Sequence, residues 1–135
     1  MIRFTTLCLA VVLAVAFPAT AQTARELDAL APKVMTLAKF AEGIALLEDL
    51  EDSPQYLVMQ RLQERDPSLL VGFENYYVEA DVRGGHGVVL VCSAGAKAAL
   101  FEDVGCKTAI ERDVRAQPNP NWCTYMLNTR AVCGR

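Results

Sequence analysis

Four cysteines crowded into the last third of the chain place the tightest limit on its fold. They are Cys92, Cys106, Cys123 and Cys133, and the remaining cysteine, Cys8, lies near the N-terminus. An even number of cysteines in a short exported chain is typical of disulfides, each worth about 2–4 kcal/mol. We therefore predict two disulfides that cross-link the C-terminal half, while packing alone must hold the N-terminal half.

The N-terminus predicts export. A positive start is followed by an apolar run over residues 7–17 and by Ala-Thr-Ala at positions 19–21, the small residues that a signal peptidase recognises. The run is shorter than the roughly 20 apolar residues that span a bilayer. We expect a signal peptide over residues 1–21 and one small periplasmic or secreted domain over residues 22–135, with no stable membrane insertion after cleavage.

Charge is divided unevenly along the chain. Residues 22–81 carry 12 acidic and 5 basic side chains, whereas residues 82–135 carry 4 acidic and 7 basic ones. A net acidic domain repels the phosphate backbone, so we expect no nucleic-acid partner. The opposite signs indicate either two faces that attract each other or a field that steers a protein partner.

The N-terminal half has the periodicity of helices. Apolar residues share one helix face at alternating steps of three and four: Leu27, Leu30, Val34, Leu37, Ala41 and Ile44. The stripe covers too few heptads to require a coiled coil, so it predicts a helix over residues 25–50 packed on its own domain, with Pro32 in its first turn. A Ser-Pro pair at 53–54 predicts a second helix to about residue 65, and Asp-Pro at 66–67 a further short turn.

The middle of the chain changes to the two-residue period of strands. Between residues 76 and 83, inward Tyr76, Val78, Ala80 and Val82 alternate with outward Tyr77, Glu79, Asp81 and Arg83. Residues 84–87, Gly-Gly-His-Gly, predict a turn. Residues 88–91 are apolar throughout and predict a second strand buried on both faces.

Two structures compete for the segment from Ser93 to Gly105. Ser93 can cap a helix that Gly105 ends, and helix propensity favours this interpretation. Alternatively, residues 94–97 form a turn and residues 98–103 a third strand.

The choice bears on the disulfides. A helix of about ten residues would hold Cys92 and Cys106 about 15 Å apart, too far for a disulfide, so both would pair with the two later cysteines. The strand would allow Cys92–Cys106 and leave Cys123–Cys133 to bridge a final hairpin.

The C-terminal region predicts a short helix over residues 108–116, a loop over 117–121, and strands over 122–127 and 131–133. The fold class is therefore α+β. N-terminal helices pack on a small, mainly antiparallel sheet, and two disulfides cross-link the C-terminal half.

The sequence carries no complete catalytic or metal-binding motif. His86 is the only histidine and no cysteine pair has the two-residue spacing of a zinc motif, so we expect no metal and no cofactor, and place His86 at a loop tip. Residues 91–95 match a nucleophile elbow poorly, which leaves a weak Ser93 and His86 pairing. Glu79 with Asp81 is the best placed carboxylate pair for a small hydrolase.

A binding surface is the better-supported hypothesis. The candidate residues combine aromatic and cationic side chains that are common at interfaces: Tyr77, Arg83, His86, Arg112, Arg115 and Arg130. Trp122 and Tyr76 are predicted to fill the core. We expect a non-catalytic exported protein that binds another protein of the cell envelope or outside the cell, such as an inhibitor, an immunity protein or an accessory subunit. The alternatives are the small hydrolase and a redox-active thiol protein.

Overall fold

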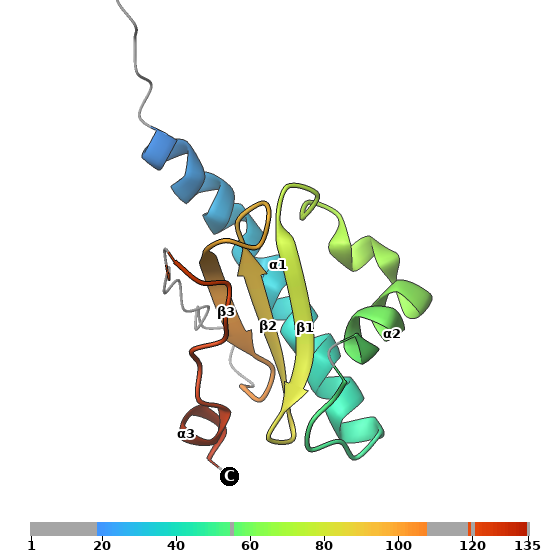
Figure 1. The fold of residues 1–135 in the computed structure, drawn as a ribbon. Helices are drawn as coiled ribbons and strands as arrows, with labels where there is room; N and C mark the ends of the chain where they lie inside the picture. The colour runs from blue at the N-terminus through green and yellow to red at the C-terminus, as the bar shows by residue number, and fades with distance from the viewer. Residues whose placement is uncertain (1–18, 55, 108–118, 120, 135) are drawn as a thin grey trace, which may run out of the picture.

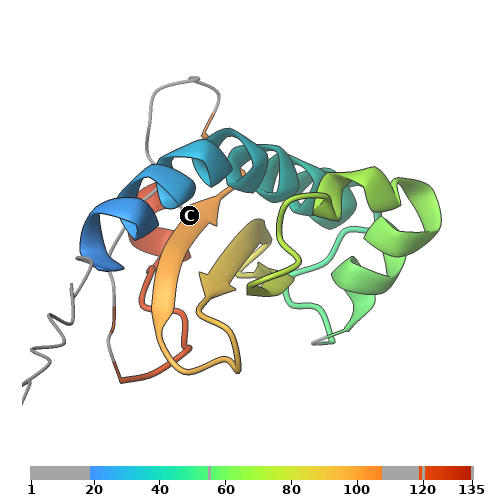
Figure 2. The same ribbon diagram turned by 90° about the horizontal axis from the view of Figure 1, so that it is seen from above.

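The computed structural model describes residues 19–54, 56–107, 119 and 121–134. A long helix, α1 (Ala19–Leu47), lies across one face of a three-stranded antiparallel sheet, and the C-terminal segment lies on the other face (Figure 1, Figure 2). The α+β class with a small antiparallel sheet is confirmed. None of the helices in the described part of the chain is long and apolar enough to cross a bilayer.

Helix α1 is built by the apolar stripe. Apart from the half-buried Leu27, the residues of the stripe are buried against the sheet: Leu30, Val34, Leu37, Ala41 and Ile44. The prediction that Pro32 lies in the first turn is wrong, because α1 begins at Ala19 and Pro32 lies inside it. Leu30 and Val34, on either side of the proline, pack into the same core, which offsets the backbone hydrogen bond that proline cannot make.

The second helix, α2 (Leu57–Arg65), begins a few residues later than expected, and Pro67–Leu70 form the short 3-10 helix η1. Ser53 therefore does not cap α2. Its hydroxyl instead donates to Asp81 Oδ1 at 2.6 Å and accepts the backbone N–H of Val82 at 2.8 Å, which ties the loop to the first strand.

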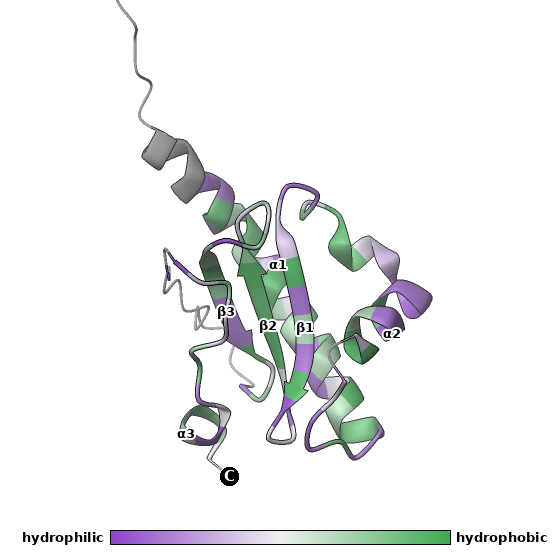
Figure 3. Cartoon of the chain, viewed as in Figure 1, coloured by the Kyte–Doolittle hydropathy of each residue, from purple (hydrophilic) through white to green (hydrophobic). Residues whose placement is uncertain are grey.

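The sheet has the order β1-β2-β3 and begins with the predicted hairpin. Its strands are β1 (Tyr77–Arg83), β2 (His86–Cys92) and β3 (Ala99–Val104). Gly84 and Gly85 form the turn at φ +57° and +78°. Figure 3 shows β2 as hydrophobic along most of its length, and all seven of its residues are buried, as its pattern predicted. The expected alternation of β1 fails at Asp81, which was predicted to face outward but is buried.

The favoured helix between Ser93 and Gly105 is wrong, and the alternative strand is correct. A tight turn follows β2, in which Ser93 N–H donates to the Ala98 carbonyl and Ala98 N–H to the Ser93 hydroxyl. Strand β3 then pairs with β2 and buries five of its six residues. Sheet pairing and burial outweigh local helix propensity here.

The strands predicted over 122–127 and 131–133 are also wrong. Residues 122–128 have no regular secondary structure, and helix α3 (Thr129–Cys133) replaces the last strand. The side chain of Asn128 caps α3 by accepting the N–H of Ala131 at 3.2 Å, and Gly134 ends it at φ +79°. The helix predicted over 108–116, and all of the signal peptide but its last three residues, lie outside the described residues.

Candidate functional site

Residues 121–128, which we call the C-terminal strap, run along β3 on the outer face of the sheet (Figure 1). The disulfide Cys92–Cys123 joins the strap to β2. Tyr125 reaches β1, where its hydroxyl donates to the Glu79 carbonyl at 3.2 Å, and Met126 reaches β3, where its N–H donates to Glu102 Oε1 at 2.5 Å. One covalent bond and contacts to all three strands therefore hold the strap in place.

The second disulfide, Cys106–Cys133, holds α3 against the opposite end of the sheet. The prediction of two disulfides from these four cysteines is confirmed. The pairing Cys92–Cys106, which we had linked to the strand alternative, is wrong. Because β3 runs antiparallel to β2, it carries Cys106 from the Cys92 end of the sheet to the His86 end. Strand β3 therefore holds Cys92 and Cys106 too far apart to pair, as the alternative helix would have done.

The strap presents large apolar side chains to solvent. Trp122 is 68% exposed and Met126 is 60% exposed, and the partly exposed Tyr77 stands opposite Cys92 on the same face. The prediction that Trp122 fills the core is wrong. Cys123 turns toward Cys92, and the preceding tryptophan points outward.

The predicted surface residues are scattered over several environments. Tyr77 and Arg83 occupy the two ends of β1, and the guanidinium of Arg83 lies 4.0 Å from the ring centre of Tyr125. Arg130 is exposed on α3 and lines a cavity of about 410 Å³ beside the end of α1. His86 is buried, being 4% exposed, so its expected place at a loop tip is wrong. Arg112 and Arg115 lie outside the described residues.

The carboxylates Glu79 and Asp81 lie on the face of β1 that Tyr125 of the strap contacts. Asp81 is buried, accepts the Ser53 hydroxyl, and has Oδ2 3.7 Å from Arg83 Nε. Burial, followed by the charge of Asp81, raises the pKa of the Glu79 carboxyl above its ordinary value. Burial and then the charge of Glu79 raise the pKa of the Tyr125 hydroxyl, which stays neutral. Asp81 thus joins β1 to the loop at Ser53, and the Tyr125 hydroxyl joins β1 to the strap.

A catalytic pair of Ser93 with His86 is excluded by the sheet. His86 begins β2 and Ser93 follows its last residue, so the strand holds them roughly 20 Å apart. Each side chain also has its own role. Ser93 caps the turn before β3, and His86 contacts α1.

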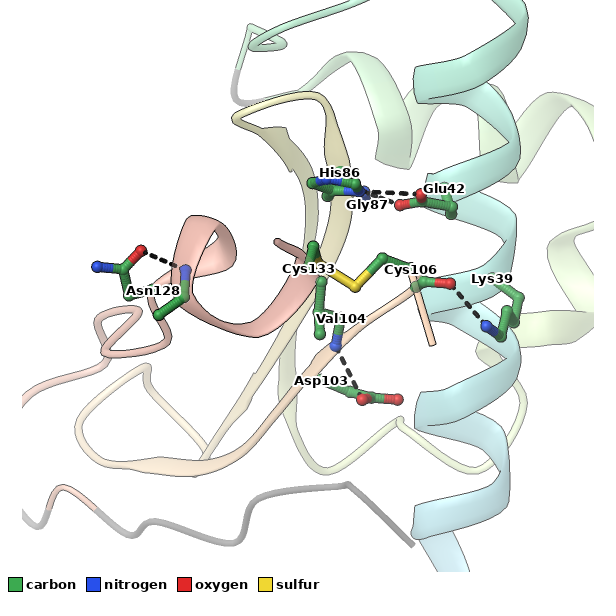
Figure 4. Close-up of a disulfide and its surroundings, with 11 residues drawn as sticks. Lys39, Glu42, His86, Gly87, Asp103, Val104, Cys106, Asn128 and Cys133 are labelled. Carbon is green, nitrogen blue, oxygen red and sulfur yellow. Dashed lines mark hydrogen bonds and ion pairs between the residues drawn. A yellow bond between two sulfur atoms is a disulfide. The ribbon is translucent and has the colours of Figure 1, made fainter. Parts of the chain in front are cut away.

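His86 is the buried member of a polar cluster that sequence patterns did not predict (Figure 4). Its Nδ1 is 3.1 Å from Glu42 Oε1, and Glu42 Oε2 accepts the N–H of Gly87 at 2.6 Å. Lys39, one turn earlier on α1, donates to the carbonyl of Gly105 at 2.6 Å. The Cys106–Cys133 disulfide lies alongside, so that a ring nitrogen and both sulfurs fall within 4.8 Å of one another.

Sequence spacing hides this cluster because its members come from α1, β2, the end of β3 and α3. One signal was available: His86 is followed by glycine and Cys106 is preceded by one. Glycines in strand positions often mark close approach of another backbone.

No protein-family model, no curated protein and no solved structure matches this chain. The disulfide-held strap and the His86 cluster are therefore the features from which a function can be inferred.

Proposed function

We propose that this chain is an exported, non-catalytic protein-binding domain that acts in the periplasm or outside the cell. An inhibitor, an immunity protein or an accessory subunit of an envelope assembly fits this description. The observation that carries the proposal is the exposure of Trp122 on a strap fixed to the sheet by Cys92–Cys123. The two disulfides also support export, because such bonds persist in oxidising compartments.

A rigid, exposed tryptophan is suited to anchoring a protein partner. Tryptophan and arginine are enriched among the residues that dominate interface energies. An indole whose backbone is already immobilised loses little conformational entropy on binding. Met126 on the strap and Tyr77 on β1 extend the apolar area, and Arg83, stacked on Tyr125, adds a cation beside it. The surface therefore suits a protein with an apolar pocket bordered by acidic residues.

The alternative is a small envelope hydrolase that uses Glu79 and Asp81. The raised pKa of Glu79 next to a second carboxylate favours it, since general acids are tuned in this way. We rank it second because Asp81 is already bonded to Ser53 and Arg83, and Tyr125 bonds the β1 backbone at Glu79.

The test is capture of a partner from envelope extract at low salt with immobilised protein. We expect Trp122→Ala with Met126→Ala to reduce capture at least tenfold without changing the circular dichroism spectrum. Tyr56→Ala is the matched control, since Tyr56 is 69% exposed but precedes α2 rather than lying on the strap. Equal capture by wild type and the strap variant would contradict this surface. Envelope hydrolysis that Glu79→Gln abolishes would instead support the alternative.

A further inference from the structure

Three metal-binding side chains converge at the end of the sheet opposite Trp122. They are His86 at the start of β2, Cys106 after β3 and Cys133 on α3, with ligand atoms within 4.8 Å of one another. The two sulfurs are joined as a disulfide in this structure, at 2.05 Å. Two thiolates and an imidazole are a ligand set that zinc prefers in proteins.

The convergence depends on two glycines that let the strands approach α1. A Cβ on Gly87 would lie 2.0 Å from the Glu42 nitrogen, and one on Gly105 would lie 2.2 Å from the Ala38 carbonyl oxygen. The glycines also bond to each other, Gly105 N–H donating to the Gly87 carbonyl at 2.7 Å. This contact places His86 and Cys106, their immediate neighbours, side by side.

The imidazole is oriented in the way that a zinc ligand requires. A carboxylate only accepts hydrogen bonds, so Nδ1 carries the proton that is donated to Glu42 Oε1. In the neutral imidazole the other nitrogen, Nε2, holds the lone pair. It is buried and has no hydrogen-bond partner within the part of the chain that the structure describes. A histidine whose remote N–H donates to a carboxylate is the usual arrangement around protein-bound zinc.

We propose that His86 Nε2 and the thiolates of Cys106 and Cys133 bind one Zn²⁺ ion when their disulfide is reduced, with Glu42 as the positioning residue. The site is thus a disulfide under oxidising conditions and a metal centre under reducing ones. It is separate from Trp122 and Cys92–Cys123, which lie at the other end of the sheet, and of the proposed binding surface only Arg83 is its neighbour, opposite His86.

The steps balance with a protein dithiol as reductant. The dithiol is oxidised to its own disulfide, its two electrons break the Cys106–Cys133 bond, and its two protons leave two thiols on this chain. Zn²⁺ then displaces a proton from each thiol, two Zn–S bonds form, and both protons pass to water. Neutral His86 supplies the third bond from its lone pair.

The ligand atoms already lie within 4.8 Å of one another, and around tetrahedral zinc such atoms lie roughly 3.5–3.8 Å apart. The ion can therefore enter once the disulfide opens and the two sulfurs move apart. Lys39 and Glu42 hold the chain beside Cys106 and His86 from α1 during this change. Three protein ligands leave the fourth position for water.

The test is titration of Co²⁺ into protein reduced with a phosphine under argon. We expect sulfur-to-cobalt charge-transfer bands and tetrahedral d–d bands that saturate at one Co²⁺ per chain and are removed by Zn²⁺. Cys106→Ser with Cys133→Ser should abolish them, while the matched Cys92→Ser with Cys123→Ser should keep them. His86→Ala should weaken binding at least tenfold, and Glu42→Gln about 10–100-fold.

The following results would overturn the proposal. Equal binding by the two double-serine variants would mean adventitious chelation by free thiols, and bands insensitive to His86→Ala would exclude the imidazole. If the reduced chain is unfolded without metal, Zn²⁺ must restore its far-ultraviolet circular dichroism and must protect Cys106 and Cys133 from iodoacetamide more than the other two cysteines. A reduced chain that stays unfolded or equally alkylated with excess Zn²⁺ does not contain this site.

Discussion

Gly87 and Gly105 are hydrogen-bonded neighbours on β2 and at the end of β3, and both lie directly against the backbone of α1. Their missing side chains set the distance between the helix and this end of the sheet. The positions of His86, Glu42 and Cys106 all follow from that distance.

Alanine at either glycine should therefore destabilise the fold. A Cβ would come within 2.2 Å of α1 backbone atoms, which cannot move as a side chain can. We expect Gly105→Ala to lower the free energy of unfolding by about 3 kcal/mol, at the upper end for overpacking. Urea denaturation measures it. Gly43→Ala is the control: nothing lies within 4 Å of a Cβ on this helical glycine, so a gain of about 0.5–1 kcal/mol is expected. Equal effects at both sites would contradict this packing.

The apolar stripe of α1 should carry most of the stability of the N-terminal half. Leu37 is fully buried under the sheet. We expect Leu37→Ala to lower the free energy of unfolding by about 2–5 kcal/mol through lost contacts and the cavity left behind. Leu47→Ala, at the exposed end of the same helix, should change it by less than about 0.5 kcal/mol. Thermal and urea unfolding of both variants would show whether α1 packs by this face.

The two disulfides should contribute comparably to stability. They close loops of similar length, with sequence separations of 31 and 27 residues. Removing either by a double serine substitution should cost about 2–4 kcal/mol, because the unfolded chain regains similar freedom. Non-reducing peptide mapping should recover Cys92 with Cys123 and Cys106 with Cys133. Recovery of a peptide pair containing Cys92 and Cys106 would contradict the antiparallel path of β3.

The stability of the protein should respond to the ionisation of Glu79. Its pKa in the folded state is raised above the ordinary 4.5, so the folded protein holds this proton more tightly than the unfolded chain does. Stability from this group is present at low pH and is lost as pH rises from about the unfolded pKa through the folded one. Glu79→Gln should therefore be more stable than wild type at neutral pH, and the two should converge below pH 4.5.

Glu74→Gln serves as the control for Glu79→Gln, because we expect it to be less stable than wild type at neutral pH. Hydrogen bonds from backbone N–H groups, that of Gly72 first, lower the pKa of the Glu74 carboxyl, so its contribution is present at neutral pH and is lost in acid. Melting temperatures of both variants between pH 3 and 8 would test the pair. If Glu79→Gln were the less stable protein at neutral pH, the burial of this carboxyl beneath the strap would be wrong.

Local pattern was sufficient to place α1 and the hairpin, but not to find where α1 begins or which residue precedes α2. The stripe from Leu30 to Ile44 and the alternation from Val78 to Val82 each repeat with the period of one element, so each segment specifies its own structure. The number of disulfides also followed from composition. The helix expected after Ser93 failed because its propensity was weak and a free edge of β2 was available to pair with β3.

The sequence by itself determined which segments are apolar on one side and which cysteines are available to pair. Tertiary structure alone decided that Tyr125 of the strap reaches β1 while Trp122 stays exposed, and that His86 lies beside Cys106 and Cys133. The physical reason is distance along the chain. These contacts join residues 20 to 47 positions apart, and no local period records a contact of that range. Only the antiparallel return of β3 and the close packing of Gly87 and Gly105 on α1 bring them together.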